Sequence, residues 1–265
     1  MGRYKSTLGR LLVGACVLSL GVGMAPAALA RPVVAFKIAP VPVLVDPSNP
    51  HGGTYPDTGN IFGAGAAGEA EWKISGTEYG GAPAPLTWIK IYTPVGVKVH
   101  PRSFGVCSEA ILSASGVEGC PRHSLAGWGE GTGFVTFGAT RVPETATVQV
   151  FFRPGGVVFF IRGGSPALFE LMSEGTILNA GPAFGQLFTG EVPLIASVPG
   201  ALDGSIERLR IVIGAAYKQN NKLISFITMP KTCPKGGYTA KAELSFLNGE
   251  TVPVTKKVAC PRRRR

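Results

Sequence analysis

The stretch from Cys107 to Gly133, CSEAILSASGVEGCPRHSLAGWGEGTG, constrains the fold of this chain more than any other segment. It contains two of the five cysteines and a glycine at every second position from Gly127 to Gly133. Short strand-like segments precede it, and longer ones follow it. The glycines and the Cys120-Pro121 step indicate a role in the architecture, because they supply no recognisable set of catalytic side chains.

The first thirty residues have the three parts of a secretory signal. MGRYKSTLGR carries three cations and no acid, LLVGACVLSLGVGM is a short apolar run, and Ala28-Leu29-Ala30 is a small-x-small cleavage site. We therefore expect a signal peptide over 1–30, a mature chain that begins at Arg31, and a secreted, extracellular or envelope-associated location. The run is too short and too rich in glycine to be a membrane anchor, so we expect no transmembrane anchor after cleavage. The alternative is a lipobox that ends at Cys16, which would make this cysteine a lipidated first residue.

The charge of the chain is concentrated at its C-terminus. The formal net charge is +10, and removing the three signal cations lowers it to +7, of which +4 belongs to Arg262, Arg263, Arg264 and Arg265. The remaining body is close to neutral, so we expect no nucleic-acid partner. Four consecutive arginines repel one another and cannot be buried together, which predicts an exposed basic tail over 262–265. The tail is a candidate site for anionic envelope polymers or lipids, and the alternative is a role in solubility alone.

Four cysteines follow the predicted signal peptide, and an even number in an exported chain indicates disulfides. Three pairings are open, and we expect the local one, Cys107–Cys120 and Cys233–Cys260. Each short loop would contribute about 3 kcal/mol or slightly more through lost chain entropy. A zinc site is the alternative, but the chain lacks both a Cys-x-x-Cys pair and histidines suitably near. We expect no metal and no cofactor.

Proline and glycine dominate the region before the first clear strand. Six prolines between Arg31 and Pro56 are expected to prevent regular pairing, so 31–68 is predicted to be an extended N-terminal arm. Its end contains a Gly-x-Gly-x-x-Gly sequence, Gly63 to Gly68. A dinucleotide site needs a strand before that sequence and a helix after it. Here Pro/Gly-rich sequence precedes it and the strand-like EAEWKISG follows, which favours a flexible linker.

From Glu69 onward, the pattern of apolar and polar residues is typical of β-strands. A turn at Arg153-Pro154-Gly155-Gly156 separates two apolar runs and predicts a hairpin. Cys107–Ser115 is the best short helix, tied back by Cys120, while Pro166–Ser173 fits either a helix or an extended segment. With 37 glycines and 22 prolines, the sequence predicts an all-β fold, an antiparallel β-sandwich over 69–261 with about nine short strands and one short disulfide-tied helix. The predicted strands are Glu69–Gly76, Leu86–Thr93, Gly133–Thr140, Ala146–Phe152, Val157–Arg162, Glu207–Ala215, Leu223–Thr228, Tyr238–Leu247 and Thr251–Val258.

The last predicted hairpin also predicts its register. A two-residue turn would place the apolar faces of its two strands on opposite sides of the sheet. A three-residue loop that ends at Gly249 instead pairs Leu244 with Val252, and Gly249 can adopt the left-handed conformation that this loop needs. The same register brings Cys260 toward Cys233, which supports the second disulfide.

Three segments together carry a resemblance to a known group of proteins. They are Ala84-Pro-Leu with Tyr92-Thr-Pro-Val-Gly96, then Cys120-Pro-x-x-Ser124-x-x-Gly127-x-Gly129, then Cys233-Pro-Lys-Gly-Gly237 with Cys260-Pro. The chain resembles secreted, disulfide-containing β-sandwich proteins of high-GC soil actinobacteria over roughly Glu69–Pro261. The resemblance implies the fold and an extracellular location, and it carries over no functional residue.

No arrangement of residues in the sequence predicts catalysis. Ser124 follows His123, but its flanks do not form Gly-x-Ser-x-Gly and no aspartate is near. Glu69 and Glu71 would lie about 7 Å apart on one strand face, a separation found in inverting glycosidases. Adjacent positions on one strand seldom flank a substrate, so we expect a solvated outer face. His51 and His100 adjoin prolines and are expected in loops, and three scattered aspartates do not predict a calcium site.

Trp72, Trp88 and Trp128 are candidate sugar-stacking residues, and core or rim packing is an equally good interpretation. The sequence predicts a non-enzymatic, exported β-sandwich that acts as an interaction or structural module at or outside the cell envelope. Two alternatives use the same scaffold. One is an extracellular hydrolase, and the other is a carbohydrate-binding module with coplanar, exposed tryptophans.

Overall fold

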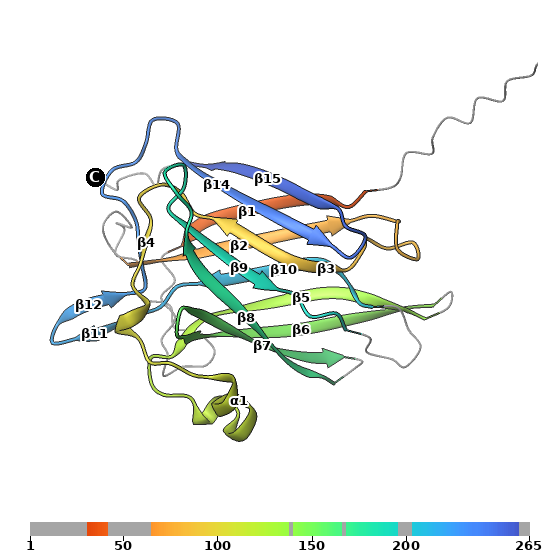
Figure 1. The fold of residues 1–265 in the computed structure, drawn as a ribbon, viewed down its shortest axis with the longest axis horizontal. Helices are drawn as coiled ribbons and strands as arrows, with labels where there is room; N and C mark the ends of the chain where they lie inside the picture. The colour runs from red at the N-terminus through yellow and green to blue at the C-terminus, as the bar shows by residue number, and fades with distance from the viewer. Residues whose placement is uncertain (1–30, 42–64, 138–139, 166–167, 196–202, 260–265) are drawn as a thin grey trace, which may run out of the picture.

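The fold is an antiparallel β-sandwich made largely from one sheet of thirteen strands, with a second sheet of two strands (Figure 1). The computed structural model describes residues 31–41, 65–137, 140–165, 168–195 and 203–259. The order of the large sheet is β15-β14-β3-β9-β8-β7-β6-β5-β10-β2-β13-β4, with β1 paired to β2, and β11 pairs with β12 in the small sheet. The strands are β1 (Val33–Val41), β2 (Gly65–Ser75), β3 (Leu86–Tyr92), β4 (Lys98–Val99), β5 (Leu125–Phe137), β6 (Thr140–Arg153), β7 (Gly156–Ser165), β8 (Glu170–Asn179), β9 (Gln186–Glu191), β10 (Ser205–Ile213), β11 (Ala216–Gln219), β12 (Lys222–Ser225), β13 (Ile227–Thr228), β14 (Tyr238–Phe246) and β15 (Thr251–Val258).

The large sheet folds over so that its two halves face each other. Figure 1 shows β14, β15, β1 and β2 in one layer and β5, β6 and β7 in the other. Strand β15 is at one end of the sheet, and β1 is beside β2 near the other end. The two strands contact each other, so the folded sheet brings its ends side by side. The predicted all-β sandwich class is therefore confirmed. The prediction of about nine short strands was too low, and β5 and β6 are long, with 13 and 14 residues.

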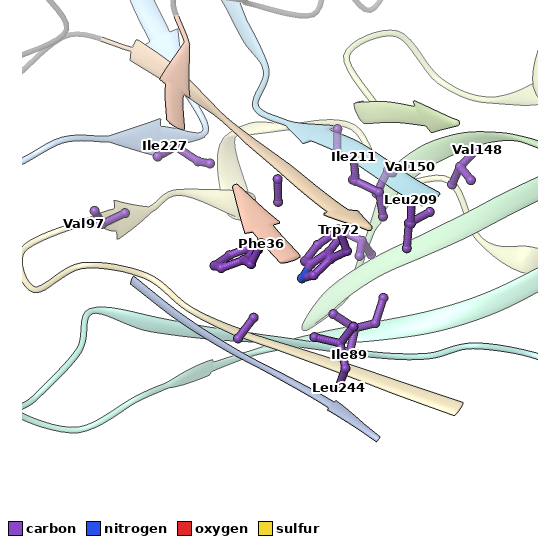
Figure 2. Close-up of a cluster of buried hydrophobic side chains, with 14 of the residues drawn as sticks. Phe36, Trp72, Ile89, Val97, Val148, Val150, Leu209, Ile211, Ile227 and Leu244 are labelled. Carbon is purple, nitrogen blue, oxygen red and sulfur yellow. The ribbon is translucent and has the colours of Figure 1, made fainter. Parts of the chain in front are cut away.

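The hydrophobic core lies between the two layers. Figure 2 shows Trp72 of β2 with Phe36 of β1, facing Ile89 of β3 and Leu244 of β14 across the interior. Inward positions of β6 and β10, which alternate with polar outward positions, also contribute to the cluster. These inward residues are Val148, Val150, Leu209 and Ile211.

The alternating glycines of β5 allow its backbone to approach β10 closely. They pair with inward core positions of β6, as Gly129 does with Val148, and therefore lie on the inner face of the sheet. A Cβ atom at Gly129 would lie 2.6 Å from the carbonyl oxygen of Arg210 in β10, whereas one at Gly131 would have no neighbour closer than 3.7 Å. The first contact is closer than any side chain tolerates, so the sheet can bend between β5 and β10 only because this face lacks side chains.

Both predicted hairpins are present. In the β14–β15 hairpin, Leu244 pairs with Val252, and Gly249 adopts the left-handed conformation with φ of 83°, which confirms the predicted register. In the β6–β7 hairpin, Arg153 pairs with Gly156 across a two-residue turn. Each of these registers is determined locally, because the turn joins strands that are adjacent in the sequence.

The short helix and its disulfide are also confirmed. Helix α1 (Glu109–Ser115) begins after Ser108, whose side chain accepts a hydrogen bond from the Ile111 amide. The Cys107–Cys120 disulfide ties the helix back, with Cα atoms 5.2 Å apart. Single-turn 3₁₀ helices flank α1 at Pro101–Ser103 and Val117–Gly119. Cys233 is also disulfide-bonded, while Cys260 lies outside the described residues, so the Cys233–Cys260 pairing stays a prediction.

The prediction of an unpaired N-terminal arm is wrong for the part that the structure describes. Residues 33–41 form β1, which pairs with β2 along its whole length, from Val33 with Ser75 to Val41 with Ala67. Pro40 is tolerated there because β1 forms ladder hydrogen bonds on one side only, as an edge strand does. The glycine-rich sequence at 65–68, expected to be a flexible linker, likewise forms the start of β2.

Besides β1 and the two-residue β4, strands β8 and β9 of the large sheet were not predicted. The ambiguous segment Pro166–Ser173 is extended from Glu170 onward, where β8 begins. Both strands carry glycine on the inner face, and Gly175 pairs with Gly190. Among the described residues, no helix has the length and apolar character needed to cross a membrane.

We predict that Gly129→Ala lowers the free energy of unfolding by about 1–3 kcal/mol, because the added methyl group pushes β5 away from β10. Gly131→Ala is the matched control, two residues along the same strand face. It should leave stability unchanged or raise it by up to about 1 kcal/mol, because alanine has less chain entropy to lose. Urea unfolding followed by tryptophan fluorescence measures both. Equal effects of the two substitutions would contradict the close approach.

Candidate functional site

A cavity of about 160 Å³ lies between the two layers of the sandwich. Strands β2, β3 and β5 to β10 all contribute to its lining. The lining is predominantly aliphatic and aromatic, and its side chains include Ile91, Val148, Phe159, Ile161, Phe188 and Leu209. A concave apolar site with few polar groups is the usual form of a small-molecule binding site.

Small inward residues create the space for this cavity. Gly131 and Gly133 of β5, Ala146 of β6 and Gly190 of β9 all line it. Neighbouring strands carry valine or isoleucine at their inward positions. The glycines and the alanine have no such side chain, so that volume stays empty. The cavity therefore follows from the same inner-face glycines that let the sheet bend.

One wall of the cavity is an aromatic ring laid over glycine. A Cβ atom at Gly175 would lie 2.8 Å from Cε2 of Phe159, and one at Gly190 would lie 3.0 Å from the same atom. The ring therefore rests directly on the Gly175–Gly190 pair of β8 and β9. An aromatic side chain that covers a cross-strand glycine pair restores the packing that the glycines lack.

Among the described residues that line the cavity, Trp72 has a buried polar atom without a hydrogen-bond partner. Trp72 is fully buried, and its Nε1 has no hydrogen-bond acceptor among the described residues. Ser205, another lining residue, is satisfied, because its hydroxyl donates to the Pro83 carbonyl oxygen over 2.7 Å. The described lining contains no histidine, cysteine, lysine or arginine. No local pattern in the sequence indicates this cavity, because its lining comes from eight strands.

The three tryptophans do not form a common surface for sugars. Trp72 is fully buried, whereas Trp88 is 43% exposed on β3. Trp128 lies on β5, with the guanidinium of Arg210 over its ring at 4.7 Å from the centroid. Strands β3 and β5 are separated by β9, β8, β7 and β6 in the sheet. The interpretation of all three as a stacking platform is therefore wrong, because tertiary packing places them in different surroundings.

Ser124 and His123 are held as parts of a turn. Ser124 is buried, and its hydroxyl donates to the Pro121 carbonyl oxygen over 2.7 Å. His123 adopts a left-handed backbone conformation with φ of 62°, and its ring stacks on Tyr217 with centroids 4.0 Å apart. The serine proton is thus bound to a backbone carbonyl, while the imidazole packs on an aromatic ring.

Glu69 and Glu71 lie on the outer face of β2, as expected, and each is bound by an arginine of β10. Arg210 Nε lies 2.6 Å from Glu69 Oε1, and Arg208 Nε lies 2.8 Å from Glu71 Oε1. Arg208 also reaches Glu130 of β5 at 3.0 Å, and Lys37 of β1 reaches Glu71 at 3.5 Å. A row of alternating charges therefore crosses β1, β2, β10 and β5. The two glutamates are engaged in cross-strand pairing and do not face a substrate cleft.

The hydrogen bond from Arg208 holds the pKa of Glu71 below its ordinary value of 4.5, and the charges of Lys37 and Arg208 act in the same direction. Partial burial of the carboxylate acts the other way. The ion pair therefore outweighs desolvation, and the carboxylate stays ionised to lower pH than an isolated glutamate.

The described residues contain no cluster of three or more histidine, cysteine, aspartate or glutamate side chains that could hold a metal. His100 is exposed, with Nε2 3.1 Å from the Thr228 hydroxyl oxygen. His51, the predicted signal peptide with Cys16, and the tail Arg262 to Arg265 lie outside the described residues, so those interpretations stay predictions. Comparison with protein-family models, curated proteins and solved structures finds no match to this chain.

We predict that Glu71→Gln destabilises the protein at neutral pH and that the difference from the wild type shrinks in acid. A carboxylate with a lowered folded-state pKa stabilises the fold above its unfolded pKa, and this contribution disappears as pH falls from about 4.5 through the lower folded value. Urea unfolding of both proteins between pH 7 and pH 2 measures the effect. Glu170→Gln is the control, because its pair with Arg162 is exposed on both sides and contributes about 0–1 kcal/mol. A constant difference at every pH would contradict the assignment.

Proposed function

We propose that this protein is a non-enzymatic, exported β-sandwich that binds a small apolar ligand in the cavity between its two layers, as an interaction module at or outside the cell envelope. The cavity is the observation that carries the proposal. An engineered apolar cavity of about 150 Å³ in another protein stays dry and binds benzene, and the cavity described above is of similar size, about 160 Å³. A water molecule in such a space finds too few polar partners, whereas a hydrocarbon gains contacts on every side.

The size of the cavity sets the expected affinity. Each buried methylene group contributes about 0.8 kcal/mol, so a ligand of eight to ten carbons gains roughly 6–8 kcal/mol before costs. Loss of translational and rotational freedom opposes binding by at least about 4 kcal/mol. Ordered walls reduce further costs, because Phe159 is already held against Gly175 and Gly190. The net gain is then at most about 2–4 kcal/mol, so we expect dissociation constants for simple hydrocarbons of about 1 mM or weaker.

The chemistry of the lining favours binding over catalysis. Catalysis by a serine needs a base within hydrogen-bond reach of its hydroxyl. Ser205 donates its hydroxyl proton to a backbone carbonyl, and the described lining offers no histidine, cysteine or lysine. The polar lining residues are mainly threonines, with Glu144 and Glu191. Such a lining can retain an apolar molecule but presents no activated nucleophile.

The predicted signal sequence and the disulfide support export, and the basic tail supports a location at the envelope. The Cys107–Cys120 disulfide is the kind of bond that persists in oxidising compartments. The tail Arg262 to Arg265 would hold the protein near anionic polymers or lipids of the envelope. In this arrangement, the sandwich binds the ligand, and the tail keeps the protein at the anionic surface of the envelope.

We predict that Ala146→Phe weakens binding of n-butylbenzene at least tenfold, because the added ring occupies the cavity. Isothermal titration calorimetry on the mature chain measures the dissociation constant. Thr147→Phe is the matched control, since Thr147 is exposed and adjacent, and it should leave affinity unchanged. Ala146→Phe should also keep or raise thermal stability, because it fills empty space. Unchanged affinity in Ala146→Phe would place the hydrocarbon elsewhere, and the absence of any binding to the wild type would disprove the proposal.

We further predict that the basic tail gives salt-dependent retention. Each arginine contributes about 1 kcal/mol at an anionic surface, and exposed charges are screened beyond about 8–10 Å at physiological salt. A chain truncated before Arg262 should bind vesicles containing phosphatidylglycerol less than the full chain at low salt, and the two should converge at 1 M salt. Equal binding at low salt would leave the tail a solubility element.

A further inference from the structure

The unpartnered indole of Trp72 lies at the centre of the interior. The ring stacks on Phe36 with centroids 5.5 Å apart and an interplanar angle of 18°. Figure 2 shows its nitrogen on the edge of the ring turned across the interior, toward the strands that carry Ile89 and Leu244. Trp72 and Ile89 both line the cavity. The donor is therefore buried, aimed into apolar surroundings, and without an acceptor among the described residues.

A donor in this position has a cost that the fold does not require. The indole nitrogen can only donate, and leaving a buried donor unsatisfied destabilises the folded state. Phenylalanine would supply a stacking ring without that cost. A bridging water needs two to four polar partners, and the residues opposite the nitrogen are aliphatic. The missing acceptor is best supplied by a molecule that also fills apolar space.

The acceptor must be uncharged. An ionised carboxylate in an apolar site needs a compensating cation, and the described lining contains no lysine, arginine or histidine. An alcohol could accept from the indole, but its own proton would then need an acceptor close to Trp72, where the aliphatic Ile89 and Leu244 lie opposite the nitrogen. A carbonyl oxygen has no such proton.

We infer that the ligand of this cavity is an apolar molecule with one neutral carbonyl oxygen, a ketone, an aldehyde or an ester, which accepts a hydrogen bond from Trp72 Nε1. This inference rests on the proposed function and specifies its ligand. The hydrocarbon part packs against Phe159, Ile161 and Leu209, and the carbonyl group reaches the buried end of the site at Trp72. Trp72 is thus the residue that determines specificity, while the remaining walls select for apolar bulk.

The test compares two probes that share a carbon skeleton, n-butylbenzene and its ketone, butyrophenone. Their dissociation constants are measured by calorimetry for the wild type and for Trp72→Phe. The preference for the ketone over the hydrocarbon should fall about 2- to 12-fold in Trp72→Phe, because a neutral hydrogen bond contributes about 0.5–1.5 kcal/mol. Hydrocarbon affinity should change little, since phenylalanine keeps a stacking ring beside Phe36.

Tyr238→Phe is the matched control. Its hydroxyl is also buried and unpartnered among the described residues, but it lines a separate apolar pocket of about 70 Å³ beside Val97, Met229 and Val258. Removing this donor should leave the preference between the two probes unchanged. A loss of preference in both variants would indicate a general structural effect and would overturn the assignment to Trp72.

The remaining outcomes separate the two proposals. If neither probe binds the wild type, the cavity is not a ligand site and the proposed function fails. If both probes bind and Trp72→Phe weakens them equally, the cavity binds ligand but the carbonyl inference is wrong. Tighter binding of 4-phenylbutanoate than of butyrophenone would overturn the requirement for a neutral acceptor.

Discussion

The approach of the β10 backbone to the inner face of β5 is the constraint on which this structure depends. Side chains on that face would hold the two strands apart, and a Cβ atom at Gly129 already lies within 2.6 Å of a β10 carbonyl oxygen. With glycine there, one continuous sheet can turn sharply and bring its two halves face to face. The same turn allows β15 to lie beside β1. A chain without this glycine row would have to build its core from separate sheets or leave one face open to water.

The cavity is a consequence of the same solution. Gly131 and Gly133 line it from β5, and Gly190 lines it from β9, so the residues that permit the bend also remove volume from the core. Protein interiors are otherwise packed like organic crystals, and an empty space of this size lowers stability. Phe159 limits the loss by covering the Gly175–Gly190 pair. A fold that keeps both an apolar void and a buried, unsatisfied indole retains two unfavourable features in one place, which is why we assign function to that place.

The outer surface shows how the bent sheet is held in register. Lys37, Glu71, Arg208 and Glu130 alternate in charge across four neighbouring strands, and Glu69 pairs with Arg210. Opposite charges on adjacent strands stabilise one register and disfavour a shift by one residue, which would move every side chain to the other face. The strands linked in this way include β5 and β10, whose backbones approach closely at Gly129. At the β5–β10 pair, ion pairs on the outer face therefore stabilise the register, while glycines on the inner face allow the close approach of the two backbones.

Features that depend on neighbours along the chain can be predicted from the amino-acid sequence alone. The register of β14 with β15 follows from a loop that ends at Gly249, and the helix at 109–115 follows from the Ser108 cap and the Cys107–Cys120 link. Turns and short loops fix these contacts with little freedom left. Tertiary contacts decide that 33–41 is a paired strand, because its partner β2 supplies the hydrogen bonds. Burial of Trp72 and the existence of the cavity were decided in the same way. Each depends on strands far apart in the sequence meeting across the interior, and no local pattern encodes which side chains will be opposite one another there.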